Sequence, residues 1–467
     1  MTPARDRRAL WVAAPLIVGL LAGLSILVDY RLILAGSVAV AIGWVGLRNP
    51  HLLVLGIFAS ILFDRLGVTG AKVAKLPITA SKLAVLGSLG LWVVHVGLTR
   101  KPGIRIHPVL GAMVGMTLVT GMAVTFSGDF DLGRFSLMGI GMVTILTGLV
   151  YVILAEHDLT NIYRVLGVIL ALSLATSVAG GAANQAGRAT GSFGDPNEWA
   201  TLVLMVTPAV LGGLVADPHR GAQFLRIALL GLAPLAVFAS GSRAALLVGI
   251  AVSIGCFSFL KQRRNELLVC LGGGLVAAPF VVDVDNAIAR FGRLLGRASG
   301  AGMVDDSSLD ERSELLRQGI DLFLNNWLLG VGPGRFAKAT GFISLEGRLR
   351  PAHNTYLEVA SEQGLIGLAA GFIFMATVTW TLWKAWKLSP DDRHRARVVG
   401  MAAGLAAVSI MAATLGLLTF SMAYLMLGIA LAVTDQAERA GRAHLAAHPP
   451  DGHATLPGLR ARREHPR

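Results

Sequence analysis

The stretch GVGPGRFAKATGFISLEGRLRPAHNTYLEVASEQGLIG occupies residues 330–367 and ends the one long polar interruption in an otherwise apolar chain. Apolar residues make up 54% of the sequence and charged residues 15%, whereas a soluble domain carries about 25% charged residues. The apolar residues come in long runs separated by short polar clusters, which is typical of helices that cross a membrane several times. We therefore expect an all-α, polytopic membrane protein.

Roughly fourteen apolar segments have helical length, and the shortest of them leave a count of about twelve to fourteen membrane helices. The segments lie at 10–28, 31–47, 51–63, 83–98, 109–126, 135–155, 164–180, 199–215, 225–240, 244–260, 266–283, 364–384, 398–416 and 418–433. The first follows the basic sequence MTPARDRR and is too long for a typical signal sequence, so we expect it to be retained.

The basic residues predict the orientation of these helices. With the N-terminus in the cytoplasm, alternation places TRKPGIRIH, DPHRGAQFLR, KQRRN, KAWKLSPDDRHRAR and the Arg-rich C-terminal tail on the cytoplasmic side, as the positive-inside rule requires. The opposite face receives 181–198, 240–243 and the long loop 284–363. Segment 64–82 departs from the rule, because it falls on that outer face with four basic side chains. This topology explains the net charge of +13 without a nucleic-acid partner.

Two motifs at helix starts on the outer face are candidates for binding an anion. The sequence DPNE at 195–198 has the form of a capping box with proline at the first helical position. Asp195 and Asn197 either only cap that helix or, with Arg188 nearby, help to hold an anion at its N-terminus. Arg243, in the turn SGSRAALL, either reaches the lipid headgroups or is a fixed cation for the phosphates of a lipid-linked substrate.

The long outer loop contains two predicted helices and a glycine-rich turn. NAIARFGRLLGRASG carries arginines at helical spacing and predicts an amphipathic helix lying on the membrane. SSLDERSELLRQ predicts a capped helix with its apolar residues facing inward. Arg312 lies in the first turn of this helix, where a cation is unfavourable for the helix dipole, which favours a role in ligand binding. GVGPGRF follows a helix and lacks the Lys-Ser/Thr ending of a P-loop, so it predicts a tight turn with at most a backbone contact to an anion.

His353 is the candidate general base of the chain. It precedes a helical pattern that begins at Asn354, and Glu358 and Glu362 follow on one face of that helix at i, i+4 spacing. A helix N-terminus disfavours a protonated imidazole, and a neutral imidazole is what a general base needs. Taken alone, a single histidine at the membrane surface is structural more often than catalytic.

Several motifs in this order resemble the O-antigen ligase/polymerase superfamily of bacterial membrane glycosyltransferases. They are GSFGDPNEWA, SGSRAALL, an arginine and a tryptophan before GVGPGRF, and above all HNTYLEVASEQGLIGL, and together they extend over about 185–385. The resemblance implies a multi-pass protein of the bacterial inner membrane with cytoplasmic termini and a large helical periplasmic loop. It also implies transfer of a glycan from an undecaprenyl-diphosphate carrier to a glycan or lipid acceptor within the membrane, at its periplasmic face.

The resemblance assigns roles to particular residues. His353 matches the histidine proposed for catalysis, and Arg243 and Arg312 match the arginines thought to engage the donor diphosphate. Asn197, Arg188, Asn354 and Glu358 are candidates for supporting roles. Two arginines can stabilise a leaving diphosphate without a metal or another cofactor, and activation of an acceptor hydroxyl by His353 predicts inversion at the anomeric carbon.

The same resemblance divides the chain. We expect N-terminal transmembrane helices over 1–183, the helices of a ligase-like core over 184–283, the periplasmic loop over 284–363, C-terminal transmembrane helices over 364–433, and a disordered cytoplasmic tail over 434–467.

Three functions remain open from the sequence. A glycan ligase and a polymerase of lipid-linked repeat units differ only in the acceptor, and the motifs do not separate them. A membrane transporter or flippase for a polar or lipid-linked substrate is the alternative from a functional class other than enzymes. It is disfavoured because the centres of the apolar segments contain almost no ionisable residues. A non-catalytic assembly partner is the third function, and it would not need His353, Arg243 or Arg312.

Overall fold

The computed structural model describes residues 46, 48–63, 80–99, 106–178, 189–190, 195–215, 217–259, 307–341 and 351–448. The described residues form α-helices and contain no β-strand, which confirms the predicted fold class. The helices are α3 His51–Phe63, α4 Ala80–Thr99, α5 Pro108–Ser127, α6 Phe130–Leu154, α7 Thr160–Val178, α8 Pro196–Leu214, α9 Arg220–Ala239, α10 Arg243–Phe259, α13 Ser307–Asn325, α14 Phe336–Thr340, α15 Thr355–Leu388, α16 Asp392–Met411 and α17 Ser421–Ala447.

Every predicted apolar segment that falls in the described residues coincides with one of these helices. The segments 10–28, 31–47 and 266–283 lie outside them, as do the amphipathic helix predicted around residue 290, most of segment 64–82 and the first part of the periplasmic loop. Six described helices are long and apolar enough to cross a membrane, namely α5, α6, α7, α8, α9 and α15. The chain is therefore a multi-pass membrane protein.

The C-terminal part differs from the prediction in one respect. Helix α17 continues to Ala447, so a disordered tail does not begin at residue 434. Ala437 and Gly441 are buried, and Gly441 leaves no room for a Cβ beside the carbonyl group of Leu388. The charges in this stretch are paired within the fold, since Lys384 Nζ lies 2.6 Å from a carboxylate oxygen of Glu438. The charged composition therefore belongs to the end of a packed helix.

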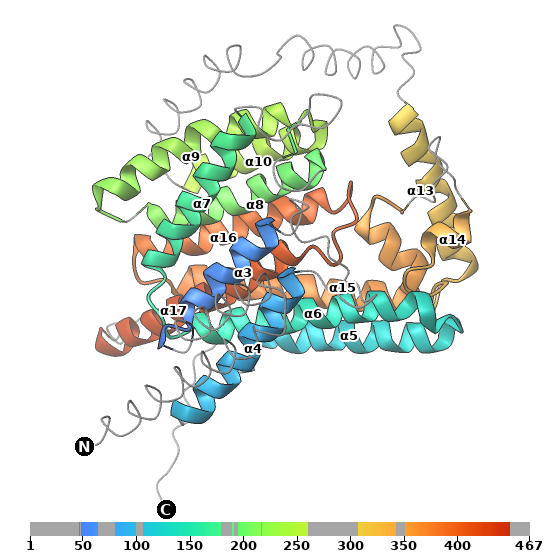
Figure 1. The fold of residues 1–467 in the computed structure, drawn as a ribbon, viewed down its shortest axis with the longest axis horizontal. Coiled ribbons are helices and arrows are strands. Elements are labelled where there is room, and N and C mark those ends of the chain that lie inside the picture. The colour runs from blue at the N-terminus through green and yellow to red at the C-terminus, as the bar shows by residue number, and fades with distance from the viewer. Residues whose placement is uncertain are drawn as a thin grey trace, which may run out of the picture.

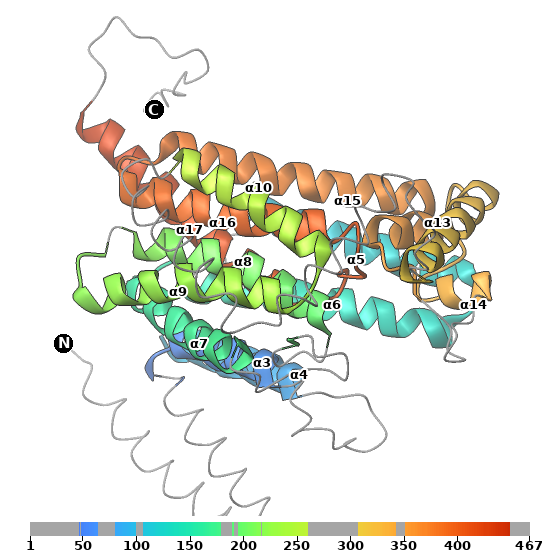
Figure 2. The ribbon, with the colours of Figure 1, turned by 90° about the horizontal axis from the view of Figure 1, so that it is seen from above.

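Helices α5, α6, α15, α16 and α17 lie along one axis and alternate in direction, so the bundle has two ends, whereas α4 and α7 run obliquely to them (Figures 1 and 2). The loop end consists of the turn at 128–129, helices α13 and α14, the start of α15 and the segment 412–421. The basic end consists of the turn at 155–159, the residues 217–219 and the turn at 389–391. Contacts across the chain support this grouping, because Thr355 Oγ1 donates to the Leu415 carbonyl at the loop end and Gln436 donates to the His157 carbonyl at the basic end.

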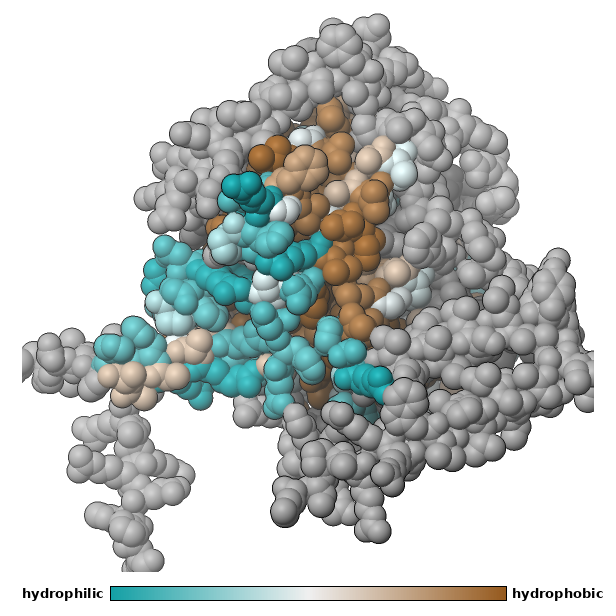
Figure 3. Space-filling model, turned by 60° about the vertical axis from the view of Figure 1, so that its left-hand side comes forward, coloured by the Kyte–Doolittle hydropathy of each residue, from teal (hydrophilic) through white to brown (hydrophobic). Residues whose placement is uncertain are grey.

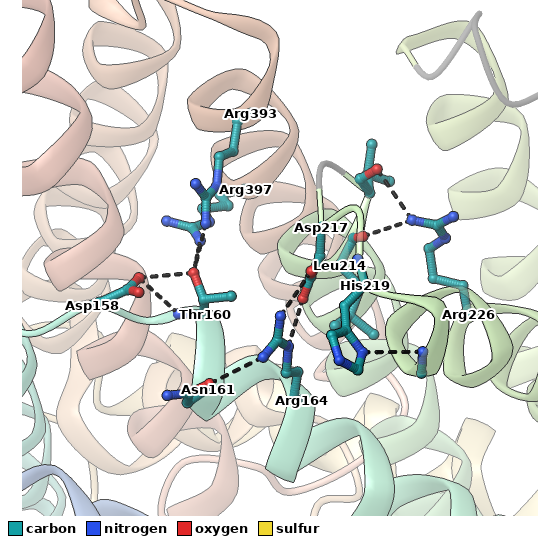
Figure 4. A network of polar contacts seen from close by, with 12 residues as sticks. Asp158, Thr160, Asn161, Arg164, Leu214, Asp217, His219, Arg226, Arg393 and Arg397 are labelled. Atoms are coloured by element: carbon teal, nitrogen blue, oxygen red, sulfur yellow. Dashed lines mark hydrogen bonds and ion pairs between the residues drawn. The ribbon is translucent and has the colours of Figure 1, made fainter.

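Arginine contacts join the helices at the basic end (Figure 4). Arg164 donates to both carboxylate oxygens of Asp217, at 2.7 and 2.9 Å, and this hydrogen-bonded cation lowers the pKa of Asp217 to about 2. Arg226 is buried and donates to the Leu214 carbonyl, so it compensates the negative end of the α8 dipole. The guanidinium groups of Arg393 and Arg397 both donate to the hydroxyl of Thr160. Seen from this side, hydrophilic residues gather next to a hydrophobic band (Figure 3).

Aromatic residues near the end of α15 mark a membrane boundary on the bundle. Trp380, Trp383 and Trp386 are 60%, 42% and 38% exposed, and the Lys387 ammonium group lies 4.0 Å from the centre of a Trp383 ring. Exposed tryptophans beside a lysine are typical of the interface between lipid and water. The basic end therefore lies at one membrane surface.

Candidate active site

The stretch 330–367 folds into a close pairing of two backbone segments. Val331 N–H donates to the Ser361 carbonyl and Gly332 N–H to the Glu362 carbonyl, both at 2.9 Å. Helix α15 is interrupted at Gly364, which has a φ of 64° and a non-helical ψ of −157°. A Cβ on Gly364 would collide with the Leu328 carbonyl group, and a Cβ on Gly330 with the backbone of Glu362. Both positions require glycine, because φ is positive there and the neighbouring backbone leaves no room for a Cβ.

The amides of the glycine-rich turn bind a carboxyl group of the same chain. Gly334 N–H donates to Glu362 Oε2 at 2.7 Å, and Phe336 N–H donates to Glu362 Oε1 at 2.8 Å. Glu362 is only 3% exposed. The predicted tight turn is confirmed, but its amides are occupied by Glu362. The i, i+4 spacing with Glu358 identified Glu362 as a polar position, and no local pattern connected it to a loop 28 residues away.

Helix α14 attaches the same turn to the α5–α6 hairpin. Arg335 donates to the Ser127 carbonyl at 2.9 Å, and Lys338 Nζ lies 3.1 Å from a carboxylate oxygen of Asp129. The hydrogen bond from Lys338 holds the pKa of Asp129 below its usual value. Arg335 therefore has a structural partner at the loop end.

His353 lies where α15 begins, as predicted, and its backbone is unusual. Its φ is 48°, and it is the one residue other than glycine with a positive φ among the described residues. Left-handed backbone costs an ordinary residue on the order of 1 kcal/mol and is concentrated at functional sites. The side chain of Asn354 caps the helix by accepting from the amides of Tyr356 and Leu357, at 3.0 and 3.1 Å. Asn354 therefore fixes the turn that carries His353.

Arg312 lies on a helix that packs against this turn. A small buried cluster joins Leu315 of α13, Phe336 of α14, and Ala352 and Leu357 around the start of α15. Leu315 follows Arg312 by one helical turn, and Ala352 directly precedes His353. The half-buried Arg312 thus belongs to the part of α13 that adjoins the His353 turn.

Arg243 approaches from another part of the same end. It is the first residue of α10, directly after the turn at 240–242, and it is half-buried. Figure 2 shows the start of α10 at the loop end, where α16 finishes and α15 begins. Arg243, Arg312 and His353 therefore belong to one end of the bundle, on three different helical segments.

The start of α8 decides between helix capping and anion binding for Asp195. Asp195 accepts from the amides of Asn197 at 2.6 Å and Glu198 at 3.2 Å, so these two N-terminal amides are occupied by the cap. The capping interpretation is confirmed for Asp195. Arg188 lies outside the described residues.

Glu358 lines a cavity of about 350 Å³ between α6, the start of α15 and the segment 416–421.

In the part of the chain that the structure describes, no group of three or more His, Cys, Asp or Glu side chains could hold a metal ion.

Residues 227–372 match the family model described as O-antigen ligase. The matched part contains Arg243, Arg312, the glycine-rich turn and His353. This match supports the predicted resemblance to the O-antigen ligase/polymerase superfamily, and with it a ligase- or polymerase-like function of a membrane glycosyltransferase. A search of curated proteins gives no match to this chain.

Proposed function

We propose that this chain, with an O-antigen ligase match over 227–372, transfers a glycan from an undecaprenyl-diphosphate-linked donor to a glycan or lipid acceptor. The observation that carries the proposal is the strained His353 turn at the start of α15, packed beside the helix of Arg312. A ligase and a polymerase share this chemistry and differ in the acceptor.

The chemistry follows from charge. As the bond between the sugar anomeric carbon and the diphosphate oxygen breaks, negative charge develops on the leaving group. Arg243 and Arg312 stabilise that charge as fixed cations, so the step needs no metal ion. His353 accepts the proton of the acceptor hydroxyl, whose oxygen attacks the anomeric carbon from the side opposite the diphosphate. The product is inverted, with Asn354 holding the histidine turn and Asn197 and Arg188 in supporting positions.

The orientation of the helices determines on which side of the membrane the reaction takes place. We place the basic end in the cytoplasm, together with both termini, because arginine and lysine residues are retained on that side. The loop end then faces the periplasm of a bacterial inner membrane, where the donor presents its glycan. We propose the corresponding division of the chain, with transmembrane helices over 1–183 and 364–433, a ligase-like core over 184–283 and the periplasmic loop over 284–363.

A reconstituted transfer assay tests the role of His353. Proteoliposomes containing an undecaprenyl-diphosphate glycan should lose at least about 100-fold in transfer rate with His353→Ala, because general base catalysis contributes that much or more. The matched control is His394→Ala, a histidine in the first turn of α16 at the basic end, which should keep full activity. Full transfer activity of a folded His353→Ala variant would contradict the catalytic proposal and favour a transporter or an assembly partner.

Two arginines of one helix provide a second matched pair. Arg312→Gln should slow transfer at saturating donor, whereas Arg317→Gln should not, since Arg317 is exposed and pairs with Glu314.

The stereochemistry of the product tests the mechanism. Retention of the anomeric configuration in the product would contradict the single displacement.

A further inference from the structure

The cavity beside Glu358 is elongated along the bundle axis. Its α6 wall runs from Ser136 in the second turn to Leu146, ten residues further, which corresponds to about 15 Å of helix. Gly139, Met142 and Leu146 recur on this wall at helical spacing. The cavity therefore extends from the loop end toward the centre of the bundle.

The two ends of the cavity differ in polarity. Glu358 lies in the first turn of α15 and Ser421 is the first residue of α17, so both are at the loop end. The polar Ser136 and Thr419 and the apolar Phe135 and Leu418 line the same end. The deeper wall is apolar. Its side chains are Ile61, Val85, Met142, Val143 and Leu146. A polar end at the membrane surface above an apolar interior fits an amphiphile, with its head at the surface and its hydrocarbon along α6.

The absence of basic side chains from the described lining selects the kind of head group. Among the described residues, no side chain or backbone amide donates a hydrogen bond to the Glu358 carboxylate, and the described lining contains no Lys, Arg or His. A Cβ on Gly416 would lie 3.3 Å from Glu358 Oε2, so the glycine keeps the space before the carboxylate open. The carboxyl oxygens of Glu358 can accept hydrogen bonds from hydroxyl groups, whereas a lining without cations gives no compensation for the buried charge of a phosphate.

We propose that this cavity is the acceptor subsite and that it takes the uncharged, hydroxyl-bearing sugar end of a glycolipid. The inference rests on the proposed function, in which the donor diphosphate needs cations that this cavity lacks. Sugar hydroxyls donate to Glu358, with Ser421 and Thr419 as neutral partners, and the hydrocarbon lies against Met142 and Leu146. Glu358 follows His353 by five residues in the first turn of α15, so a sugar bound here lies near the membrane depth of the general base.

Direct binding tests the subsite without any transfer reaction. The full chain in phosphatidylcholine nanodiscs is titrated with a photoreactive alkyl β-glucoside, and the saturable label is measured and mapped. In the wild type we expect the label on 136–146 of α6. Label elsewhere, or stronger saturable labelling by an alkyl phosphate of the same chain length, would overturn the proposal.

Two variants alter the subsite in different ways. Gly416→Val fills the space before Glu358 and should weaken glucoside binding at least tenfold, and Glu358→Gln should weaken it severalfold at constant side-chain size. Glu438→Gln, at the basic end, is the control carboxylate and should bind as the wild type does. Unchanged binding in both subsite variants would overturn the proposal, and the wild-type mapping decides it if neither variant folds.

Kinetics separate this inference from the proposed function. Both subsite variants should raise the KM for the acceptor at least fivefold and leave the KM for the donor unchanged, whereas a rise in the donor KM contradicts the assignment. His353→Ala should still bind the glucoside. If His353→Ala abolishes transfer while the subsite variants leave both binding and acceptor KM unchanged, only the subsite is lost. Full transfer by His353→Ala would remove the proposed function itself, whatever the binding result.

Discussion

The Glu362 carboxylate shows how one buried side chain positions the candidate site. Its two oxygens accept from the amides of Gly334 and Phe336, and its own carbonyl accepts from Gly332. A loop that begins 32 residues before Glu362 is thereby fixed to the helix start that carries His353. Glu362 is thus a positioning residue, since its carboxylate is occupied by the loop and leaves the chemistry to other groups.

Loss of this carboxylate should release the glycine-rich turn. Glu362→Ala leaves the buried N–H group of Phe336 and the partly buried N–H group of Gly334 without this acceptor. A buried unpaired group costs about 1–3 kcal/mol and a wetter one less, so we expect destabilisation on the order of 2 kcal/mol. Glu362→Gln should cost less, because its amide oxygen still accepts one of the two bonds. Thermal unfolding in detergent measures the stability, and the rate of tryptic cleavage after Arg335 and Lys338 measures release of the loop.

The control for this experiment is Glu156→Gln, an exposed carboxylate in the turn after α6. Its unfolding temperature and its cleavage pattern should match the wild type. Unaltered protection of Arg335 and Lys338 in Glu362→Ala would show that other contacts hold the turn.

At the scale of elements, the contact between α8 and α16 is formed by glycines. A Cβ on Gly404 would collide with the Met205 carbonyl oxygen, and one on Gly400 with the Pro208 carbonyl oxygen. Gly212 of α8 faces the Ala396 carbonyl in the same way. Helix association in membranes depends on such close backbone approach, because hydrocarbon lipids give little hydrophobic driving force. These three contacts run in opposite directions along the two helices, so the cap at Asp195 and the 412–420 loop lie at the same end of the pair.

A single methyl group should therefore disturb the α8–α16 pair. Gly404→Ala requires the helices to separate, and overpacking of this kind costs about 1–3 kcal/mol. The matched control is Gly371→Ala in α15, where a Cβ meets no atom within 4 Å and a gain of helix propensity, up to about 1 kcal/mol, is expected. Thermal unfolding of both variants in one detergent makes the comparison, and equal unfolding temperatures would contradict the close packing.

Over the whole molecule, the two ends of the bundle carry different chemistry. The basic end gathers arginines that close helix termini, as Arg226 does for α8 and Arg439 does for the carbonyl of Ala155. The loop end gathers the turns that present His353, Arg243 and Arg312. Separation of the two ends by the apolar bundle keeps the proposed chemistry at one membrane surface.

The proposed sidedness has a direct test. In a background without Cys256 and Cys270, Ala339→Cys at the loop end should react with a membrane-impermeant maleimide in intact spheroplasts. Glu156→Cys at the basic end should react only after the membrane is opened. Both positions are exposed, so accessibility within the protein does not limit either reaction. Equal labelling of both positions before lysis, or the reverse pattern, would contradict the orientation.

Local sequence determined the helices of this protein and where several of them begin. Apolar length predicted α5 to α10 and α15, and the side-chain oxygens of Asp195 and Asn354 determined helix starts, because a cap depends on residues two or three positions away. Only the tertiary structure decided that the glycine-rich turn binds Glu362, that Arg335 reaches Ser127 across 208 residues, and that α17 continues past residue 434. These outcomes depend on partners brought together by the packing of distant helices, which local spacing does not encode.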